Sequence, residues 1–304
     1  MERKTWLRPA ANGEGSIFFC LYQDEHIEKK RAIIQIVHGM MSSCSRYIPL
    51  AEYLASRGFV VVMQDLQGHG RSGLTPGYFG PEDGFRYMCH DLHRLTLQAK
   101  KWYPSLPVIM FGHSMGSVLV REYAVRFPSD IDAMILSGAT GQSYKYRAAL
   151  SVMAAEKKIH GDKAVIDKYA KIMVAECNRF ITDPVNDYAF CSTDPAVCID
   201  HMKESGGIRF TVGGYYDLLK GVITVGSQDW ADAVPDIPVY FFAGGADPIG
   251  GYGIGPTEAW GWLRSGSHKD CTLRIYPGKR HEMLNETNKA EVLQDLMAWI
   301  DARF

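Results

Sequence analysis

The chain has 304 residues, 46% of them hydrophobic and 22% charged, a composition that excludes disorder and collagen-like repeats. Its 33 basic and 34 acidic residues leave a net charge of −1, so we expect no overall attraction to nucleic acid or anionic lipid. The seven cysteines contain no C-x-x-C pair, so neither a structural zinc site nor a thioredoxin-like site is indicated. No signal-peptide pattern and no membrane-spanning apolar run is found, and we expect a cytoplasmic protein with reduced thiols.

Short apolar runs of strand length recur along the chain. Each is rich in Val, Ile or Phe, a pattern typical of strands buried on both faces of a parallel sheet. The predicted strands cover residues 17–22, 32–37, 59–63, 108–111, 133–136, 237–243 and 273–276. Segments with helical spacing alternate with them at 47–56, 83–102, 117–127 and 289–302. The alternation predicts an α/β fold, with a mostly parallel sheet of the eight-stranded type flanked by helices.

The pattern changes between residues 140 and 226, where helices are expected at 144–159 and 162–177 and no buried strand appears. The second helix has an apolar stripe that we expect to pack against the core, formed by Val165, Ile166, Tyr169, Ile172 and Met173. We therefore predict one domain made of residues 1–139 and 227–304, interrupted by a helical cap at 140–226.

A specific motif, Gly112-His113-Ser114-Met115-Gly116, lies between a predicted strand and a predicted helix. This is G-x-S-x-G in the strand–turn–helix context that a nucleophile elbow requires. The turn is sharp, so the residues two before and two after Ser114 must be small, and both are glycine. The pattern predicts that Ser114 is a catalytic nucleophile.

A serine hydroxyl needs a neutral histidine to take its proton and a carboxylate to orient that histidine. In this fold the chain order is serine, acid, histidine. Asp247 and His281 each follow a late predicted strand and satisfy that order. Asp270 is the main competitor for the acid, but it precedes a strand rather than following one.

The negative charge formed during acyl transfer needs two backbone N–H donors. Met115, directly after the nucleophile, is one candidate. Met40, in the loop after the strand at 32–37, is the other. We expect His38, His69 and His113 to be structural, and five further histidines to be solvated, namely His90, His93, His160, His201 and His268. The cysteines are expected to lie away from the site, and Cys191 and Cys198 lack the matching His pair of a metal site.

Together these motifs resemble the monoacylglycerol lipase/lysophospholipase group of the α/β-hydrolase superfamily. The resemblance also rests on Arg46-Tyr47, on the segment from Asp65 to Ser72, on Asp247-Pro248-Ile249 and on His281-Glu282. It covers most of the chain. Where many members have Gly-Glu-His, this sequence has Met41-Ser42-Ser43, and Gln67 stands where the family often has Arg.

The resemblance implies hydrolysis of carboxylic esters through an acyl-Ser114 intermediate, with monoacylglycerols or lysophospholipids as substrates. It implies no cofactor and no metal, and at most transient contact with a membrane surface. The alternatives are a short-chain carboxylesterase, an acyltransferase on the same triad, or a non-catalytic ligand-binding module on the same fold. Labelling by a fluorophosphonate distinguishes the last of these from an enzyme.

Overall fold

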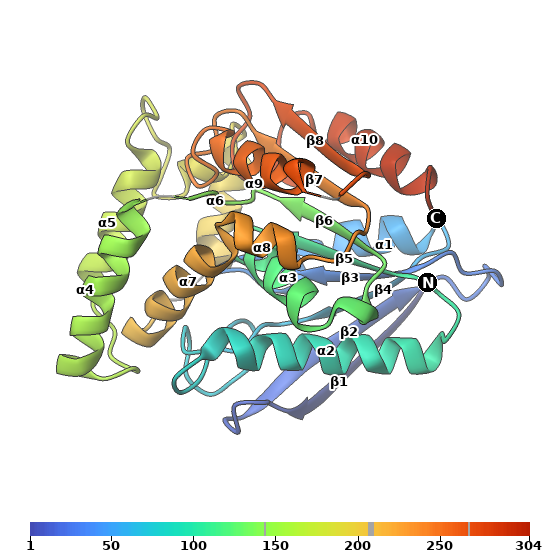
Figure 1. The fold of residues 1–304 in the computed structure, drawn as a ribbon, viewed down its shortest axis with the longest axis horizontal. Coiled ribbons are helices and arrows are strands. Elements are labelled where there is room, and N and C mark those ends of the chain that lie inside the picture. Colours follow the sequence, from blue (N-terminus) through green and yellow to red (C-terminus); the bar gives the residue numbers. More distant parts are fainter. Residues whose placement is uncertain (143, 206–209, 267) are drawn as a thin grey trace.

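Figure 1 shows the computed structural model of the protein, which describes residues 1–142, 144–205, 210–266 and 268–304. The fold is built around one eight-stranded sheet with strand order β1-β2-β4-β3-β5-β6-β7-β8. The strands are β1 (Glu2–Pro9), β2 (Ser16–Gln23), β3 (Ile33–Val37), β4 (Val60–Gln64), β5 (Val108–His113), β6 (Ala133–Ser137), β7 (Val239–Gly244) and β8 (Cys271–Tyr276). Strands β3 to β8 pair in parallel, whereas β1 and β2 are antiparallel to their neighbours. The predicted fold class is confirmed.

The central strands are buried on both faces, which explains their continuous apolar sequences. In β3, Ile33 and Val37 point into one core layer, whereas Ile34 and Ile36 point into the other. Helices cover both layers. One layer packs against α2 (Gly84–Trp102), α3 (Met115–Arg126) and α9 (Ile254–Ser265), and the other packs against α1 (Ile48–Ala55) and α10 (Lys289–Asp301).

Strand β1 was not predicted from the sequence because it has no apolar run. It lies at the edge of the sheet and pairs only with β2, so most of its side chains face solvent. An edge strand of this kind carries charged residues, as Arg3 and Lys4 illustrate.

The described residues between β6 and β7 form helices and no strand. They comprise α4 (Tyr144–His160), α5 (Asp167–Asn178), α6 (Pro195–Ser205), α7 (Val212–Val225) and α8 (Gln228–Ala233). In Figure 1, α4 and α5 stand away from the sheet, whereas α7 packs against α2 and α3. The predicted apolar stripe is only partly correct. Helix α5 begins after Val165, and Val165 and Ile172 are exposed, but Tyr169 and Met173 pack against the core.

A buried arginine joins the two ends of this helical segment. Arg121 in α3 donates hydrogen bonds from Nη1 to the carbonyl of Thr140, at 2.8 Å, and from Nη2 to the carbonyl of Val225. Its guanidinium lies 4.2 Å from the ring centroid of Trp230, whose indole N–H donates to the Arg121 carbonyl. Burial lowers the pKa of Arg121 to about 9. The segment therefore leaves and rejoins the core at one side chain.

Among the described helices, none is both long enough and apolar enough to cross a membrane.

Asp217, on α7, generates a prediction about stability. Its side chain is buried; Oδ2 accepts a hydrogen bond from the Gly84 N–H at 3.1 Å, and Oδ1 has no partner. Burial raises the pKa of Asp217 to about 7, with Asp83 adding to the rise and Lys157 and Lys220 opposing it. The folded chain therefore holds this proton up to about pH 7, whereas the unfolded chain releases it near pH 4. Stability must fall as pH rises between those values.

We predict that Asp217→Asn, which keeps the acceptor for Gly84, raises the free energy of unfolding at about pH 8 by about 1–4 kcal/mol and leaves it little changed near pH 4. Urea titrations at both pH values measure this. Asp200→Asn, at an exposed site on α6, is the control. An equal effect of Asp217→Asn at both pH values would contradict the assigned titration.

Candidate active site

Ser114 lies at the turn between β5 and α3, at the carboxyl end of a central strand. Its backbone has φ 53° and ψ −121°, a conformation rarely adopted by a residue other than glycine. The turn is held by the Ser114 N–H, which donates to the carbonyl of Ser137 at 2.9 Å, and by the Ser117 N–H, which donates to the Ser114 carbonyl at 2.8 Å. The strain lifts the side chain clear of the sheet.

The two glycines of the motif are required by close backbone contacts. A Cβ atom at Gly112 would lie 2.4 Å from the carbonyl oxygen of Gly116. One at Gly116 would lie 2.1 Å from the carbonyl oxygen of Val37, at the end of β3. Any larger residue would push α3 away from the sheet, so the spacing seen in the sequence has a steric cause.

His281 and Asp247 meet at the same end of the sheet, after β8 and β7. Nδ1 of His281 lies 2.8 Å from Oδ2 of Asp247, and both side chains are buried. The other oxygen of Asp247 accepts the N–H of Ile249 at 2.9 Å, which fixes the carboxylate. The pair leaves Nε2 as the free nitrogen of the imidazole. Asp270, the competing acid, instead pairs with Arg303.

Two opposing effects set the protonation of His281. Burial lowers the pKa of His281, but the charge and hydrogen bond of Asp247, together with the charge of Glu282, outweigh burial and raise it above its ordinary value. The neighbouring His113 ring, 4.7 Å from that of His281, behaves differently. Burial and the nearby His281 lower the pKa of His113 to about 3, so it stays neutral and bonds Ser137.

The loop after β3 passes directly over Ser114. A Cβ atom at Gly39 would lie 3.1 Å from the Cβ of Ser114, and the next residue, Met40, lines the same cavity as Ser114. Asp65 anchors this loop, because its Oδ1 accepts the Cys44 N–H at 2.7 Å while its Oδ2 accepts the Arg71 N–H at 2.9 Å. Met115 is the first residue of α3, so its N–H has no partner within the helix. Met40, expected to be one oxyanion donor, lies in the loop beside Ser114, and Met115, the other, directly follows Ser114 in the chain.

Ser114, His281 and Met40 line one narrow cavity of about 50 Å³. Its apolar walls come from Met40, Met41, Met173, Phe190 and Ile249, and its polar groups include Ser114, His113, His201, His281 and Glu282. Cys177 and Cys191 also line it, so the expectation that the cysteines lie away from the site is wrong for these two. They come from the helical segment, where spacing along the sequence gives no sign of distance to Ser114.

A buried ion cluster beside the cavity escaped the sequence analysis. Arg46 donates from Nε to both oxygens of Glu282, at 3.2 and 3.0 Å, and from Nη1 to Glu204 at 2.6 Å. Nδ1 of His201 lies 2.8 Å from Oε1 of Glu282. Burial alone would raise the pKa of Glu282, but His201 and Arg46 outweigh burial and hold the pKa of this carboxyl well below its usual range.

Three histidines therefore differ from their predicted solvated environment. His93 is largely covered, since its ring stacks on Phe127 with centroids 3.8 Å apart and its Nε2 lies 2.9 Å from Oδ2 of Asp130. His201 is buried against Glu282, and His268 is buried and bonds the Pro235 carbonyl at 2.9 Å. The local sequence of a polar helix predicts that its histidine is exposed, because a burying partner from a distant loop leaves no sign in that sequence. Residues Cys191, His201 and Glu282 also form a group whose ligand atoms all lie within 4.8 Å of one another.

The helical segment between β6 and β7 is bonded to the loop that carries His281. The N–H groups of His281 and Glu282 donate to the carbonyls of Phe190 and Cys191, at 3.3 and 2.7 Å. Arg280 donates to the carbonyls of Ala189 and Ser192, at 2.7 and 2.9 Å. The wall of the cavity and the histidine are therefore positioned together. Chemically, the arrangement offers a hydroxyl, an imidazole paired to a carboxylate, and backbone donors around an apolar slot.

Comparison with known proteins identifies the same kind of fold. Residues 28–288 match the protein family described as serine aminopeptidase, S33. A monoacylglycerol lipase from Mycolicibacterium smegmatis is 28% identical over 274 residues, which cover 89% of this chain and 88% of that protein. A monoglyceride lipase from Rattus norvegicus is 27% identical over 297 residues, covering 96% of this chain and 89% of the relative.

Among solved structures, a highly thermostable carboxyl esterase from Bacillus coagulans, in complex with glycerol, matches with a TM-score of 0.91 and 27% identity over 99% of both chains. These likenesses confirm the resemblance to the monoacylglycerol lipase-like group of the α/β-hydrolases. The match over residues 28–288 spans most of the sheet and the whole site. The chain therefore belongs to the serine aminopeptidase S33 family and is a carboxylic ester hydrolase.

Proposed function

We propose that the protein hydrolyses carboxylic esters through an acyl-Ser114 intermediate, and that its substrates are monoacylglycerols or lysophospholipids. The observation that carries the proposal is the placement of Ser114 and the His281–Asp247 pair around one cavity. His281 receives the Ser114 proton at Nε2, because Nδ1 carries its hydrogen toward Asp247. Asp247 holds this tautomer and stabilises the imidazolium that forms.

In the first half of the reaction, the Ser114 oxygen bonds to the ester carbonyl carbon while its proton passes to His281. The carbonyl oxygen becomes negative and accepts hydrogen bonds from the N–H groups of Met40 and Met115, each such donor contributing roughly 3–4 kcal/mol in the transition state. The alcohol then leaves with the proton from His281. In the second half, water adds to the acyl carbon, gives its proton to His281, and the acid departs as Ser114 recovers its hydrogen.

The substrate class follows from the lining of the cavity and from the relatives. The walls around Ser114 are apolar, which suits an acyl chain rather than a charged group. The two sequence relatives are named as lipases of monoacylglycerol, and the similar carboxyl esterase holds glycerol. A glycerol monoester combines one acyl chain with one small polar alcohol, which matches a single covered slot.

Substrate entry requires the cap, residues 140–226, to move. The free space of about 50 Å³ holds only a few water molecules. Met173 on α5 and Phe190 close the slot from the cap side, and the segment at 189–193 is bonded to Arg280, in the loop that carries His281. We therefore assign the opening to the α4–α5 arm, as lids commonly gate substrate access.

The same arm supports brief contact with a lipid surface. Ile159, Ile172 and Phe180 expose 72%, 60% and 69% of their surface. Exposed apolar side chains beside Lys157 and Lys158 are typical of interfacial contacts. The seven free thiols fit a reducing compartment, and we propose the cytoplasm.

We predict that Ser114→Ala lowers kcat/KM by about 10⁴-fold or more, because the nucleophile is lost. His281→Ala should cost a similar amount, and the double variant little more, since the two act as a unit. Ester hydrolysis and fluorophosphonate labelling measure both. Ser56→Ala, at an exposed serine, is the control. Additive losses, or labelling that survives Ser114→Ala, would show that another residue is the nucleophile.

The activity should also depend on pH through His281. The base must be neutral, and Asp247 and Glu282 raise its pKa above the ordinary value. We therefore expect kcat/KM to fall on acidification with a midpoint above about pH 6.5. Asp247→Asn should lower that midpoint, because the raising charge is removed. His69 and His113 have pKa values of about 3 and do not titrate in this range. Full activity near pH 4 in a folded enzyme would exclude a histidine base.

The length of the acyl chain should determine which esters are hydrolysed fastest. Each CH₂ of the acyl chain that becomes buried contributes about 0.8 kcal/mol to binding, and the entropy cost of ordering the acyl chain reduces this gain. We expect octanoate monoesters to be hydrolysed with higher kcat/KM than acetate esters or triacylglycerols, because one slot cannot hold three chains. Met173→Lys should abolish the octanoate preference, whereas Ile172→Lys, at the exposed neighbour, should keep it. A flat profile from acetate to octanoate in the unmodified enzyme would favour a short-chain carboxylesterase.

A further inference from the structure

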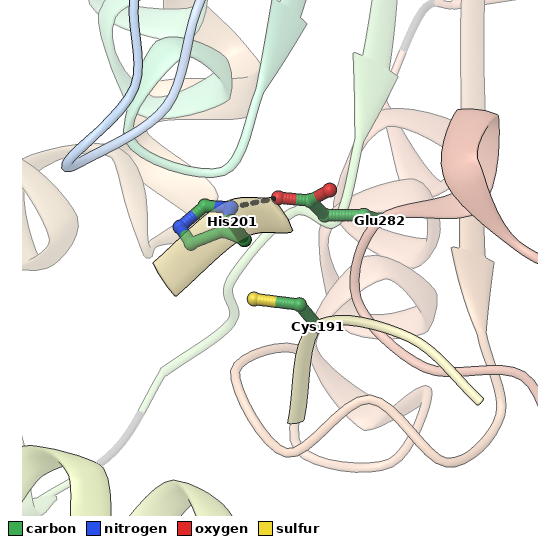
Figure 2. Close-up of side chains that lie close together, drawn as sticks. All are labelled: Cys191, His201 and Glu282. Atoms are coloured by element: carbon green, nitrogen blue, oxygen red, sulfur yellow. Dashed lines mark ion pairs between the residues drawn. The ribbon is translucent and has the colours of Figure 1, made fainter. Parts of the chain in front are cut away.

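Three potential metal ligands meet on the cap side of the cavity. Figure 2 shows Cys191, at the end of a short turn, His201 on α6, and Glu282, which follows His281, with their side chains converging. Their exposed fractions are 1%, 5% and 6%, and their sulfur, nitrogen and oxygen atoms lie within 4.8 Å of one another. Cys191 and His201 are ten residues apart, but Glu282 follows 81 residues later and joins them only in the fold, so spacing alone predicts no metal site.

The imidazole in this cluster is incompletely satisfied. Nδ1 of His201 lies 2.8 Å from Oε1 of Glu282, but the direction is wrong for a hydrogen bond, and the buried nitrogen has no hydrogen-bond partner. Figure 2 shows this contact as an ion pair, so the Glu282 carboxylate lies against the imidazole while no hydrogen bond fixes Nδ1. A cation bound between this nitrogen, the carboxylate and the sulfur would satisfy all three groups.

We propose that Cys191, His201 and Glu282 bind a thiophilic divalent cation, Zn²⁺, and that its binding inhibits the enzyme. One thiolate, one imidazole and one carboxylate are ligands that zinc accepts. Three protein ligands leave a fourth position open to water, and all three residues line the cavity that also contains Ser114.

The charges around the cluster accommodate a dication. Arg46, Glu282 and Glu204 together carry one net negative charge. Zinc and the Cys191 thiolate add one net positive charge, so the loaded cluster is neutral. Binding releases the Cys191 proton to solvent, so atoms and charge balance without a redox step. Arg46 keeps its bond to Glu204 and its contact with Oε2 of Glu282.

Inhibition follows from the position of the cluster, and this part of the inference depends on the proposed function. Glu282 is adjacent to His281, and all three ligands line the cavity with Ser114. A bound ion with its water would occupy part of a space of about 50 Å³ and obstruct the acyl group. The site itself is independent of catalysis and is tested without turnover.

The first experiment measures binding of Co²⁺, a spectroscopic probe for zinc, to the purified chain and to Ser114→Ala. We expect one equivalent in both, with a thiolate-to-cobalt charge-transfer band that Cys191→Ser abolishes and Zn²⁺ displaces. Cys177→Ser, which lines the same cavity outside the cluster, should retain the band. Absence of the band in the unmodified chain, or its survival in Cys191→Ser, overturns the site whatever the catalytic role of Ser114.

The second experiment titrates ester hydrolysis with Zn²⁺, each variant being normalised to its own activity without metal. We expect inhibition that EDTA reverses, and at least about tenfold weaker inhibition in Cys191→Ser and in His201→Gln, since each loses a ligand. Cys177→Ser should respond like the unmodified enzyme. Equal inhibition of all variants, or binding lost only in His281→Gln, would place the ion on the catalytic histidine and overturn the proposal.

Discussion

The close packing of backbone around Ser114 is the constraint on which the site depends. The carbonyl of Val37, at the end of β3, approaches Gly116 so closely that no side chain fits between them. That contact presses the first turn of α3 against the sheet and forces Ser114 into its left-handed conformation. It also brings the loop that contains Met40 next to Met115. One steric requirement therefore sets the height of the hydroxyl and the spacing of the two backbone donors around it.

The second organising element is the carboxylate of Glu282. It is buried, and it remains charged because Arg46 and His201 surround it. Arg46 comes from the segment after β3, His201 from the cap, and Glu282 from the loop that holds His281. Breaking such a pair on one side typically costs about 3–5 kcal/mol, because it leaves an uncompensated charge in the interior. The cluster thus connects the loop that holds His281 to the helical segment, and the bonds of Arg280 to Ala189 and Ser192 reinforce this connection.

Sequence reasoning succeeded where a local rule determines the structure. The apolar runs identified the buried strands, and G-x-S-x-G identified the sharp turn, because both patterns have local steric or burial causes. It failed where contacts between residues distant in the sequence determine the structure. Strand β1 has no apolar run because it is an edge, and α7, in which two glycines follow Val212, is not among the helices that the sequence predicts individually. The partners of His201 and the approach of Cys177 and Cys191 to Ser114 arise from how the helical segment folds back, which residue spacing does not encode.

The guanidinium of Arg121 has a consequence for how such a chain evolves. It binds the carbonyl where the helical segment leaves the core, at Thr140, and the one where it returns, at Val225. Because the two ends meet at one side chain, the segment behaves as a closed loop whose entropy changes only logarithmically with its length. Helices can then be lengthened, shortened or exchanged between these two anchor points without changing the sheet. The core keeps its chemistry while the inserted part diversifies, which offers a route to new acyl specificities by replacing one contiguous stretch of sequence.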